Sequence, residues 1–264
     1  MKSVLEFAAA KAEGRKISMV TCYDAAFARV LEASAVDCIL VGDSAAMVMH
    51  GFPDTLAATV ELMASHTAAV RRGAPTRFLI GDLPFLSFRK GVPAALDAVA
   101  ALMRAGAQAV KLEGVSGHED VITAIAGSGV PVMGHLGLTP QSVNALAGFR
   151  VQGRSDDDAA RIMGDARRLA ELGCFALVLE CVPAPLASRI TRALSIPTIG
   201  IGAGADCDGQ VLVLQDLLGL SNGFRPKFLR TYLDGFGQVR DAVDRFDREV
   251  KQGAFPTAAE SYDS

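Results

Sequence analysis

Short apolar runs recur eight times along the chain, and each is followed by a polar or glycine-bearing loop and then by a segment with helical periodicity. The runs cover residues 17–22, 38–41, 78–80, 109–112, 130–133, 175–179, 198–201 and 211–214. A strand, a loop and a helix repeated about eight times with short connections are typical of a closed (β/α)8 barrel with parallel strands, an α/β fold of the TIM type. A doubly wound open sheet is the structural alternative.

The composition fits one such domain. Hydrophobic residues make up 50% of the 264 residues but aromatic residues only 6%, so the core consists mainly of Ala, Val, Leu and Ile, which suits helices packed on a parallel sheet. No proline- or serine-rich linker divides the chain, and barrels of this type use about 250 residues. We expect a single domain over residues 1–264, in which residues 254–264 form a flexible tail.

Glycines that follow periodic segments predict where helices end, because glycine readily adopts the left-handed conformation of a C-cap. Residues 60–72 and 93–105 form two such segments, which are closed by Gly73 and Gly106. Pro140 is expected to open another helix as its first residue, a position that proline favours. These boundaries place the helices between the predicted strands.

The charge and the cysteines limit the partners and the compartment. The net charge is −3 and the 26 basic residues are scattered among 29 acidic ones, which argues against nucleic acid as a partner, since phosphate-binding surfaces need clustered Lys and Arg. The five cysteines are odd in number and include no Cys-x-x-Cys pair, which indicates the reducing cell interior. The first residues lack the apolar stretch of a signal peptide, and no apolar run approaches the ~18 residues that cross a bilayer. We expect a cytoplasmic protein that binds no membrane.

Polar side chains end or follow most of the predicted strands. In a (β/α)8 barrel the loops after the strands meet at one end, and the active site lies there. The residues at these positions are Asp43, Ser44, Asp82, Lys111, Glu113, His135 and Glu180. The sequence therefore predicts that they converge at one mouth of the barrel, although an Asp at a strand end is also often a turn or N-cap residue.

Asp43 and Asp82 each follow a glycine, which lets the backbone approach a ligand closely. Two such carboxylates on adjacent strands form a candidate site for a hard cation. Mg²⁺ suits it, because this ion prefers one or two carboxylates together with substrate oxygens and water. Zinc is less favoured, because no set of His and Cys residues has ligand spacing.

Lys111 and Glu113 alternate with Leu112, so both point to the same face of their strand, which is the barrel interior. A buried Lys needs a partner, either the carboxylate of a substrate or, in a purely structural alternative, that of Glu113. Glu180 ends an apolar strand and precedes Cys181, and a carboxylate in such surroundings suits a general base.

Other polar features have weaker functional interpretations. The glycine-rich segment 200–204 resembles a nucleotide loop but lacks the G-x-G-x-x-G spacing, so tight backbone packing at the barrel mouth is preferred. His50, His66 and His118 lie in loop or helix patterns and are expected to be surface or capping groups.

Seven segments of the chain together resemble the ketopantoate hydroxymethyltransferase family. They occur in order at residues 41–44, 66–73, 81–85, 110–114, 134–141, 179–183 and 199–204. The resemblance runs from about Val4 to Tyr232, and seven motifs in order are far more specific than any one of them. The chain departs from the family at Ala45 and Ala46, where Leu-Gly is usual, and at Val115, where a second glycine is usual. None of these departures removes a proposed ligand.

The resemblance implies a one-carbon transferase. A hydroxymethyl group would pass from the co-substrate 5,10-methylenetetrahydrofolate to 3-methyl-2-oxobutanoate and give 2-dehydropantoate, on the route to pantothenate and coenzyme A. By motif, Asp43 and Asp82 would bind one Mg²⁺ ion per subunit, and Glu113 would support it through water. The substrate would lie among Asp43, Ser44, Asp82, Lys111 and His135, while Glu180 would be the catalytic base that takes a proton from C3. The family also implies cytoplasmic homo-oligomers, often decamers.

Two other functions fit the same residues. A 2-oxo acid lyase or mutase of the isocitrate lyase and phosphoenolpyruvate mutase kind would use the same metal and enolate, but it would turn over without a one-carbon donor. A metabolite-binding barrel without turnover would bind a 2-oxo acid without proton exchange. Buried charges that serve no reaction are costly, which counts against the binding protein.

Overall fold

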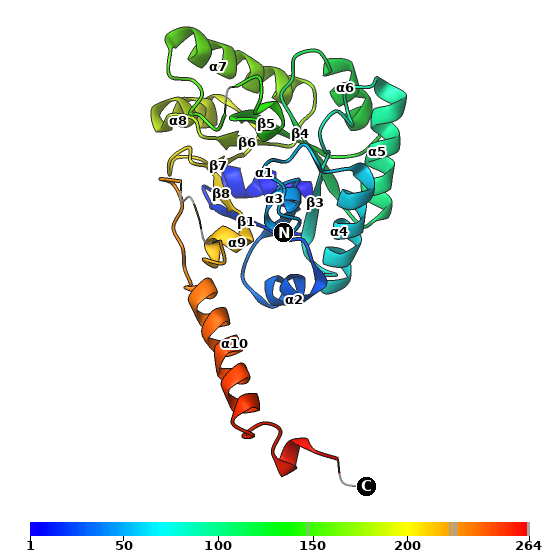
Figure 1. Cartoon of the computed structure of the whole chain (residues 1–264). Coiled ribbons are helices and arrows are strands. Elements are labelled where there is room, and N and C mark those ends of the chain that lie inside the picture. Colours follow the sequence, from blue (N-terminus) through cyan, green and yellow to red (C-terminus); the bar gives the residue numbers. More distant parts are fainter. Residues whose placement is uncertain (147, 222, 224–225, 263–264) are drawn as a thin grey trace. The chain divides into compact units, whose positions relative to one another are not determined.

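The structure is a computed structural model that describes residues 1–146, 148–221, 223 and 226–262. Eight parallel strands form a closed barrel in sequence order, and β8 pairs with β1 to complete the ring (Figure 1). The strands are β1 (Ile17–Thr21), β2 (Cys38–Val41), β3 (Phe78–Asp82), β4 (Ala109–Glu113), β5 (Val132–Gly137), β6 (Ala176–Glu180), β7 (Thr198–Ile201) and β8 (Gly209–Leu212). The predicted (β/α)8 barrel is confirmed, and the open-sheet alternative is wrong.

Helices follow β1 to β6, as the repeat in the sequence predicts, but the first helix precedes β1 and the described residues between β7 and β8 form no helix. They are α1 (Val4–Ala12), α2 (Ala25–Ala33), α3 (Ala45–Val48), α4 (Val60–Gly73), α5 (Val92–Arg104), α6 (Glu119–Gly127), α7 (Asp156–Glu171) and α8 (Ala184–Ala193). Several begin at a side chain that accepts hydrogen bonds from the first free backbone N–H groups. Asp24 does so for α2, Thr59 for α4 and Ser155 for α7.

Two of the expected helix boundaries differ from the structure. Gly106 has a φ of 111° after α5, as predicted, but Gly73 is the last residue of α4 itself. A Cβ on Gly73 would lie 2.5 Å from the carbonyl oxygen of Ala25 and 2.6 Å from the Cβ of Ala28, so this glycine serves the close approach of α2 and α4 rather than a cap. Pro140 opens only a three-residue 3-10 turn, η1 (Pro140–Ser142), and not an α-helix.

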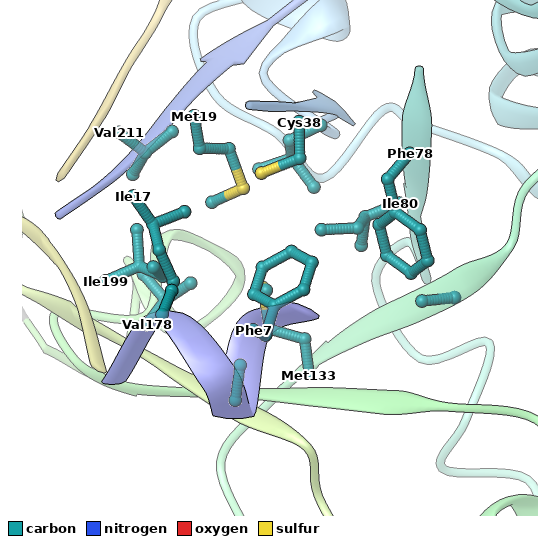
Figure 2. Packing of buried hydrophobic residues seen from close by; sticks show 14 residues of the cluster. Phe7, Ile17, Met19, Cys38, Phe78, Ile80, Met133, Val178, Ile199 and Val211 are labelled. Atoms are coloured by element: carbon teal, nitrogen blue, oxygen red, sulfur yellow. The ribbon is translucent and has the colours of Figure 1, made fainter. Parts of the chain in front are cut away.

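An apolar cluster fills the barrel at the end where the strands begin (Figure 2). Phe7 of α1 lies in its centre, with its ring centroid 5.3 Å from that of Phe78 and 5.1 Å from that of Phe175. Helix α1 also contributes Ala10, and the strands contribute the remaining side chains: Ile17, Met19, Cys38, Leu40, Phe78, Ile80, Ala109, Met133, Ala176, Val178, Ile199 and Val211. Helix α1 therefore closes this end of the barrel, so a polar site has room only at the opposite end, where the strands finish.

The residues from Leu214 onward form a second compact unit, separate from the barrel unit Met1–Val213. It contains α9 (Leu214–Leu217), α10 (Gly235–Lys251) and the 3-10 turn η2 (Ala258–Glu260). The expectation of one domain over the whole chain, with a flexible tail, stays a prediction. Residues 263–264 of that tail lie outside the described residues. Within the described part of the chain, no helix combines the length and the apolar character that crossing a membrane requires.

Candidate active site

Most of the predicted site residues lie on the inner face of the barrel strands, next to the apolar cluster. Side chains alternate along a strand, so a residue two positions after an inward-facing one also faces inward. The inward residues Ile80, Ala109, Met133 and Val178 belong to the cluster. Two positions further along the same strands stand, in turn, Asp82, Lys111, His135 and Glu180. One alternation therefore produces both the core and the site.

Asp82 and Lys111 form a buried ion pair at this end of the barrel. They are partners in the register of β3 and β4, and the Nζ atom of Lys111 lies 2.8 Å from Oδ1 of Asp82. Only 3% of Lys111 and 1% of Asp82 is exposed, so water does not screen the pair. Buried Lys111 was predicted to need a negatively charged partner, and it has one. That partner is Asp82, not Glu113 as the structural alternative had it.

His135 links this ion pair to Glu180. Its Nδ1 atom lies 3.2 Å from the Nζ atom of Lys111, while its Nε2 atom lies 2.8 Å from the carbonyl oxygen of Leu138 and 3.4 Å from Oε2 of Glu180. Burial lowers the pKa of His135, and the charge of Lys111 lowers it further, against the opposing effect of Glu180. The imidazole is therefore neutral near neutral pH. Four predicted residues thus form one row, Asp82–Lys111–His135–Glu180.

Asp43 and Ser44 reach the same place from the loop after β2. The backbone N–H of Asp43 donates to Oδ2 of Asp82 at 3.3 Å, which brings the two predicted metal ligands together. The hydroxyl oxygen of Ser44 lies 2.8 Å from that of Tyr23, whose side chain is fully buried. Burial raises the pKa of Tyr23, so this phenol stays protonated.

Glu113 completes the acidic part of the site. It is 3% exposed, and its Oε1 atom is buried without a hydrogen-bond partner among the described residues. Burial raises its pKa well above the usual range, against the attraction of Lys111, and the charges of Asp43 and Asp82 add to the rise. Burial likewise raises the pKa of Asp82 to about 7, with Lys111 opposing and Asp43 adding to the shift.

These carboxylates suit a divalent cation. Asp43, Asp82 and Glu113 are all buried, and Lys111 brings only one positive charge, so a bound divalent cation would let all three carboxyl groups ionise. The pKa of Lys111 is raised, because these carboxylates outweigh burial, which alone would lower it. Nowhere in the described ranges do three acidic, His or Cys side chains converge closely enough to hold a metal ion between them. Mg²⁺ prefers one or two carboxylates together with water or substrate oxygens, so Asp43 and Asp82 remain the candidate direct ligands.

Backbone strain gathers in two loops next to these residues. Leu86 and Cys181 have φ values of 59° and 48°, and they are the non-glycine residues with positive φ in the part of the chain that the structure describes. Leu86 lies in the loop after Asp82, and Cys181 follows Glu180 directly. Such strain occurs most often at functional sites, where the surrounding structure enforces it.

The sequence interpretation missed two residues of the site, Gln141 and Tyr23. Gln141 donates from Nε2 to Oδ2 of Asp43 at 2.8 Å, and from its backbone N–H to Oε2 of Glu113 at 3.1 Å. It stands in segment 134–141, which carries the family resemblance, but nothing in its local sequence indicates this contact. Tyr23 directly follows the predicted run 17–22, so its position after a strand is the signal that could have found it.

The histidines and the glycine-rich segment have structural environments of their own. His118, expected at the surface or as a cap, occupies the N-cap position of α6, but it is 1% exposed and its side chain makes no capping hydrogen bond. The Nε2 atoms of His50 and His66 lie 2.8 Å apart, and Nδ1 of His66 lies 2.6 Å from the carbonyl oxygen of Tyr23. A Cβ on Gly200 would lie 3.0 Å from Sγ of Cys207, which supports the packing interpretation of residues 200–204.

The sequence profile of the family described as ketopantoate hydroxymethyltransferase matches residues 2–258. The chain belongs to this family. A relative named 3-methyl-2-oxobutanoate hydroxymethyltransferase from Bdellovibrio bacteriovorus is 56% identical over 262 residues, which cover 99% of this chain and 100% of the relative. Relatives of the same name from Coxiella burnetii and Francisella tularensis subsp. novicida are 57% and 49% identical, over 95% and 100% of this chain and 95% and 99% of their own lengths. The family resemblance inferred from the motifs is confirmed.

Solved structures agree on the fold. Phosphonopyruvate hydrolase in complex with oxalate and Mg++ has a TM-score of 0.64 at 12% identity, covering 98% of this chain and 93% of that one. 2,3-Dimethylmalate lyase, a member of the PEP mutase/isocitrate lyase superfamily, has a TM-score of 0.62 at 16% identity, covering 94% and 88%. At such low identity the likeness shows the barrel fold alone.

Proposed function

We propose that this protein transfers a hydroxymethyl group from 5,10-methylenetetrahydrofolate to 3-methyl-2-oxobutanoate and so produces 2-dehydropantoate for pantothenate and coenzyme A biosynthesis. The relatives that share half or more of its residues carry the name of this reaction. The observation that carries the proposal is the buried row Asp82–Lys111–His135–Glu180 on the inner face of the barrel. Asp82, the proposed cation ligand, and Glu180, the proposed base, stand at the two ends of this row.

The acidic end of the row would hold the metal. Asp43 and Asp82 would bind one Mg²⁺ ion directly, and Glu113 would contact it through water. A bound divalent cation supplies an electrophile that stabilises negative charge on the keto oxygen by several kcal/mol. The fold neighbour solved with oxalate and Mg++ supports a divalent cation in barrels of this shape.

Lys111 and Ser44 would hold the carboxylate and keto oxygens of the 2-oxo acid. The raised pKa of Lys111 keeps its ammonium charged in the barrel, where it can attract an anionic substrate. Tyr23 fixes the hydroxyl of Ser44 from the side. These contacts would orient C3 of the substrate toward Glu180.

Glu180 would act as the base. It is less deeply buried than the other members of the row, with 17% of its side chain exposed, so a substrate could reach its carboxylate. It would accept the C3 proton, and the resulting carbanion carbon would form the new bond to the one-carbon unit. Water supplies the hydroxyl oxygen, both C–N bonds between the methylene carbon and the folate break, and tetrahydrofolate leaves after its two nitrogens take up the protons released by C3 and by water. A positioned base contributes about 10²–10⁴-fold to such a rate.

Proton exchange at C3 tests the proposal. The purified protein would be incubated with 3-methyl-2-oxobutanoate in deuterated buffer, with Mg²⁺ and with EDTA, and the C3 proton followed by NMR. We expect exchange that depends on Mg²⁺ and needs no folate. Product formation should then require the one-carbon donor. Turnover of a 2-oxo acid by bond cleavage without that donor would instead support a lyase, and tight binding without exchange would support a binding protein.

Self-association is also part of the proposal, and α10 supports it. Its large apolar residues are spaced three and four apart and are all exposed: Phe236, Val239, Val243, Phe246 and Val250. That spacing is the a and d pattern of helices that pair with one another. We expect Val243→Glu to reduce the oligomer size measured by light scattering, and Gln238→Glu, on the polar face, to leave it unchanged.

We also propose a cytoplasmic location. All five cysteines are free, and Cys22, Cys38, Cys174 and Cys207 are buried. Burial raises the pKa of Cys174 to about 12, so this thiol behaves as an inert apolar group. Free buried thiols are typical of proteins kept in a reducing compartment.

A further inference from the structure

The side chain of Gln141 connects the turn η1 to the acidic part of the site. Its Nε2 atom donates to Oδ2 of Asp43 at 2.8 Å and to the carbonyl oxygen of Leu83 at 2.9 Å. A side-chain amide nitrogen carries two hydrogens, so both are used. Only 6% of Gln141 is exposed, and its amide is therefore held in one orientation.

The backbone of the same residue contacts a second carboxylate. The N–H of Gln141 donates to Oε2 of Glu113 at 3.1 Å. One residue of a short turn after β5 thus binds an acidic group from the loop after β2 and another from β4.

We infer that Gln141 is a positioning residue that selects which oxygen atom Asp43 presents to the bound cation and which oxygen atom Glu113 presents to the water that links it to that cation. It occupies Oδ2 of Asp43 and Oε2 of Glu113, and this leaves Oδ1 and Oε1 for the ligand. The second of these atoms, Oε1 of Glu113, is buried without a hydrogen-bond partner among the described residues. The inference rests on the proposed function, because it assumes a divalent cation at the site.

The chemistry of an amide explains why glutamine suits this position. A carboxylate that is free to rotate loses conformational entropy when it binds an ion. A hydrogen bond that already fixes the carboxylate removes this cost from the binding step. Lys or Arg could make the same bond, but their charge would repel a cation. Glu at position 141 would add one more negative charge to a buried group of three. A neutral donor such as an amide orients the carboxylates without neutralising their negative charge, which remains available to attract the cation.

The test compares metal affinity in variants of the full chain. Gln141→Met keeps the length of the side chain but removes both donors, and its backbone N–H still reaches Glu113. Binding of Mn²⁺, a spectroscopic substitute for Mg²⁺, would be measured by electron paramagnetic resonance without substrate. We expect the Kd for Mn²⁺ to rise about 10- to 100-fold, as outer-shell substitutions do. Gln141→Asn, whose amide is one methylene too short, should shift it in the same direction.

A second glutamine provides the matched control. Gln108 directly precedes β4, so it lies at the end of the barrel opposite the site. Its side chain accepts hydrogen bonds from Arg71 and from the backbone N–H of Leu79 in β3. Gln108→Met should lower the unfolding temperature but leave the Kd for Mn²⁺ unchanged. A purely structural role for Gln141 would give the same pattern in Gln141→Met, which is why affinity and stability are measured together.

The outcomes separate this inference from the proposed function. If the wild type binds Mn²⁺ and exchanges the C3 proton, but folded Gln141→Met keeps its Kd within twofold of the wild type, only the role of Gln141 is wrong. If the wild type itself neither binds Mn²⁺ nor exchanges the proton, both proposals fall. Should Gln141→Met fail to fold, Gln141→Asn decides by the same twofold criterion.

Discussion

The Nζ atom of Lys111 lies 3.2 Å from the Nδ1 atom of His135, and this contact determines the tautomer of the imidazole. An ammonium group has no acceptor, so Nδ1 must be the unprotonated nitrogen and Nε2 must carry the hydrogen. That hydrogen is shared between the carbonyl oxygen of Leu138 and, at a longer distance, Glu180. A neutral imidazole therefore orients Glu180 without adding a cationic partner, which would weaken a carboxylate as a base.

Glu180→Gln should abolish proton abstraction while leaving substrate binding nearly intact. The amide has the size of the carboxylate but cannot accept a proton from C3. We expect the exchange rate of 3-methyl-2-oxobutanoate, measured by NMR in deuterated buffer, to fall by about 10²–10⁴-fold. Calorimetry should give a Kd for the substrate close to that of the wild type. Glu171→Gln, on the exposed surface of α7, is the control, and normal exchange in Glu180→Gln would remove Glu180 from the role of base.

Lys111→Met should destabilise the metal-free protein strongly, by about 3–5 kcal/mol, because it leaves the buried carboxylate of Asp82 without its ion-pair partner. Adding Asp82→Asn removes that unpaired charge, so the double variant should recover part of the loss. The free energy of unfolding would be measured in urea with EDTA for the wild type, both single variants and the double variant. We expect a coupling energy of about 1–3 kcal/mol. Additivity within about 0.5 kcal/mol would show that the pair contributes nothing.

The convergence of the site residues could be predicted from the sequence because it follows from local alternation. Once Ile80 and Ala109 face the core, Asp82 and Lys111 must face it too. The partner of Lys111 could not be predicted in this way. It depends on the register between β3 and β4, which sets Asp82 opposite Lys111. Barrel closure fixes this stagger for all eight strands together, and no single segment encodes it.

Gln141 escaped the sequence analysis for a related reason. Its contacts depend on the path of the chain after β5, and the α-helix expected at Pro140 proved to be a turn of three residues. A longer helix would have given residue 141 a different direction. Polar residues that end strands can be found from periodicity, whereas a polar residue inside a loop has no period to reveal it.

Gly137→Ala should destabilise the protein by more than the cost of placing an alanine in the left-handed conformation, and it should also disturb the site. Gly137 has a φ of 94°, and a Cβ there would lie 2.1 Å from the carbonyl oxygen of Glu180 and 2.6 Å from Cγ2 of Val182. The strand bearing Glu180 would have to move. Gly129→Ala is the matched control, because Gly129 has a φ of 81° but open space around its Cβ position.

The difference between the two alanine variants isolates the clash. Gly129→Ala should cost about 1–2 kcal/mol from its left-handed conformation alone. We expect Gly137→Ala to exceed this by about 1–3 kcal/mol, the usual cost of overpacking, and to slow C3 exchange as well. Equal losses of unfolding free energy in urea, with normal exchange in both variants, would contradict this explanation.

His118 should make the protein less stable in mild acid. Its ring is buried beside that of Phe88, at a centroid distance of 5.1 Å, and its Nε2 atom has no hydrogen-bond partner among the described residues. Burial lowers its pKa below the usual 6.5, and the charge of Arg89 lowers it further, against the carbonyl groups of Ser116 and Gly114. Below pH 6.5 the unfolded chain therefore takes up a proton at His118 that the folded protein does not. Stability should be complete above this pH and fall as the pH drops below it, by up to about 1.4 kcal/mol per pH unit.

His118→Phe should remove this part of the pH dependence, because phenylalanine fills a similar volume beside Phe88 and takes up no proton. The free energy of unfolding would be measured in urea with EDTA at pH 5.5 and pH 7.5. We expect the free energy of unfolding to fall less in the variant than in the wild type when the pH drops from 7.5 to 5.5. The fall that remains in the variant includes the contribution of His135, whose pKa is also lowered. The value at pH 7.5 is the internal control, since the wild-type ring is neutral there in both states and only packing differs. An equal loss in both proteins would mean that the folded protein protonates His118 as readily as the unfolded chain does.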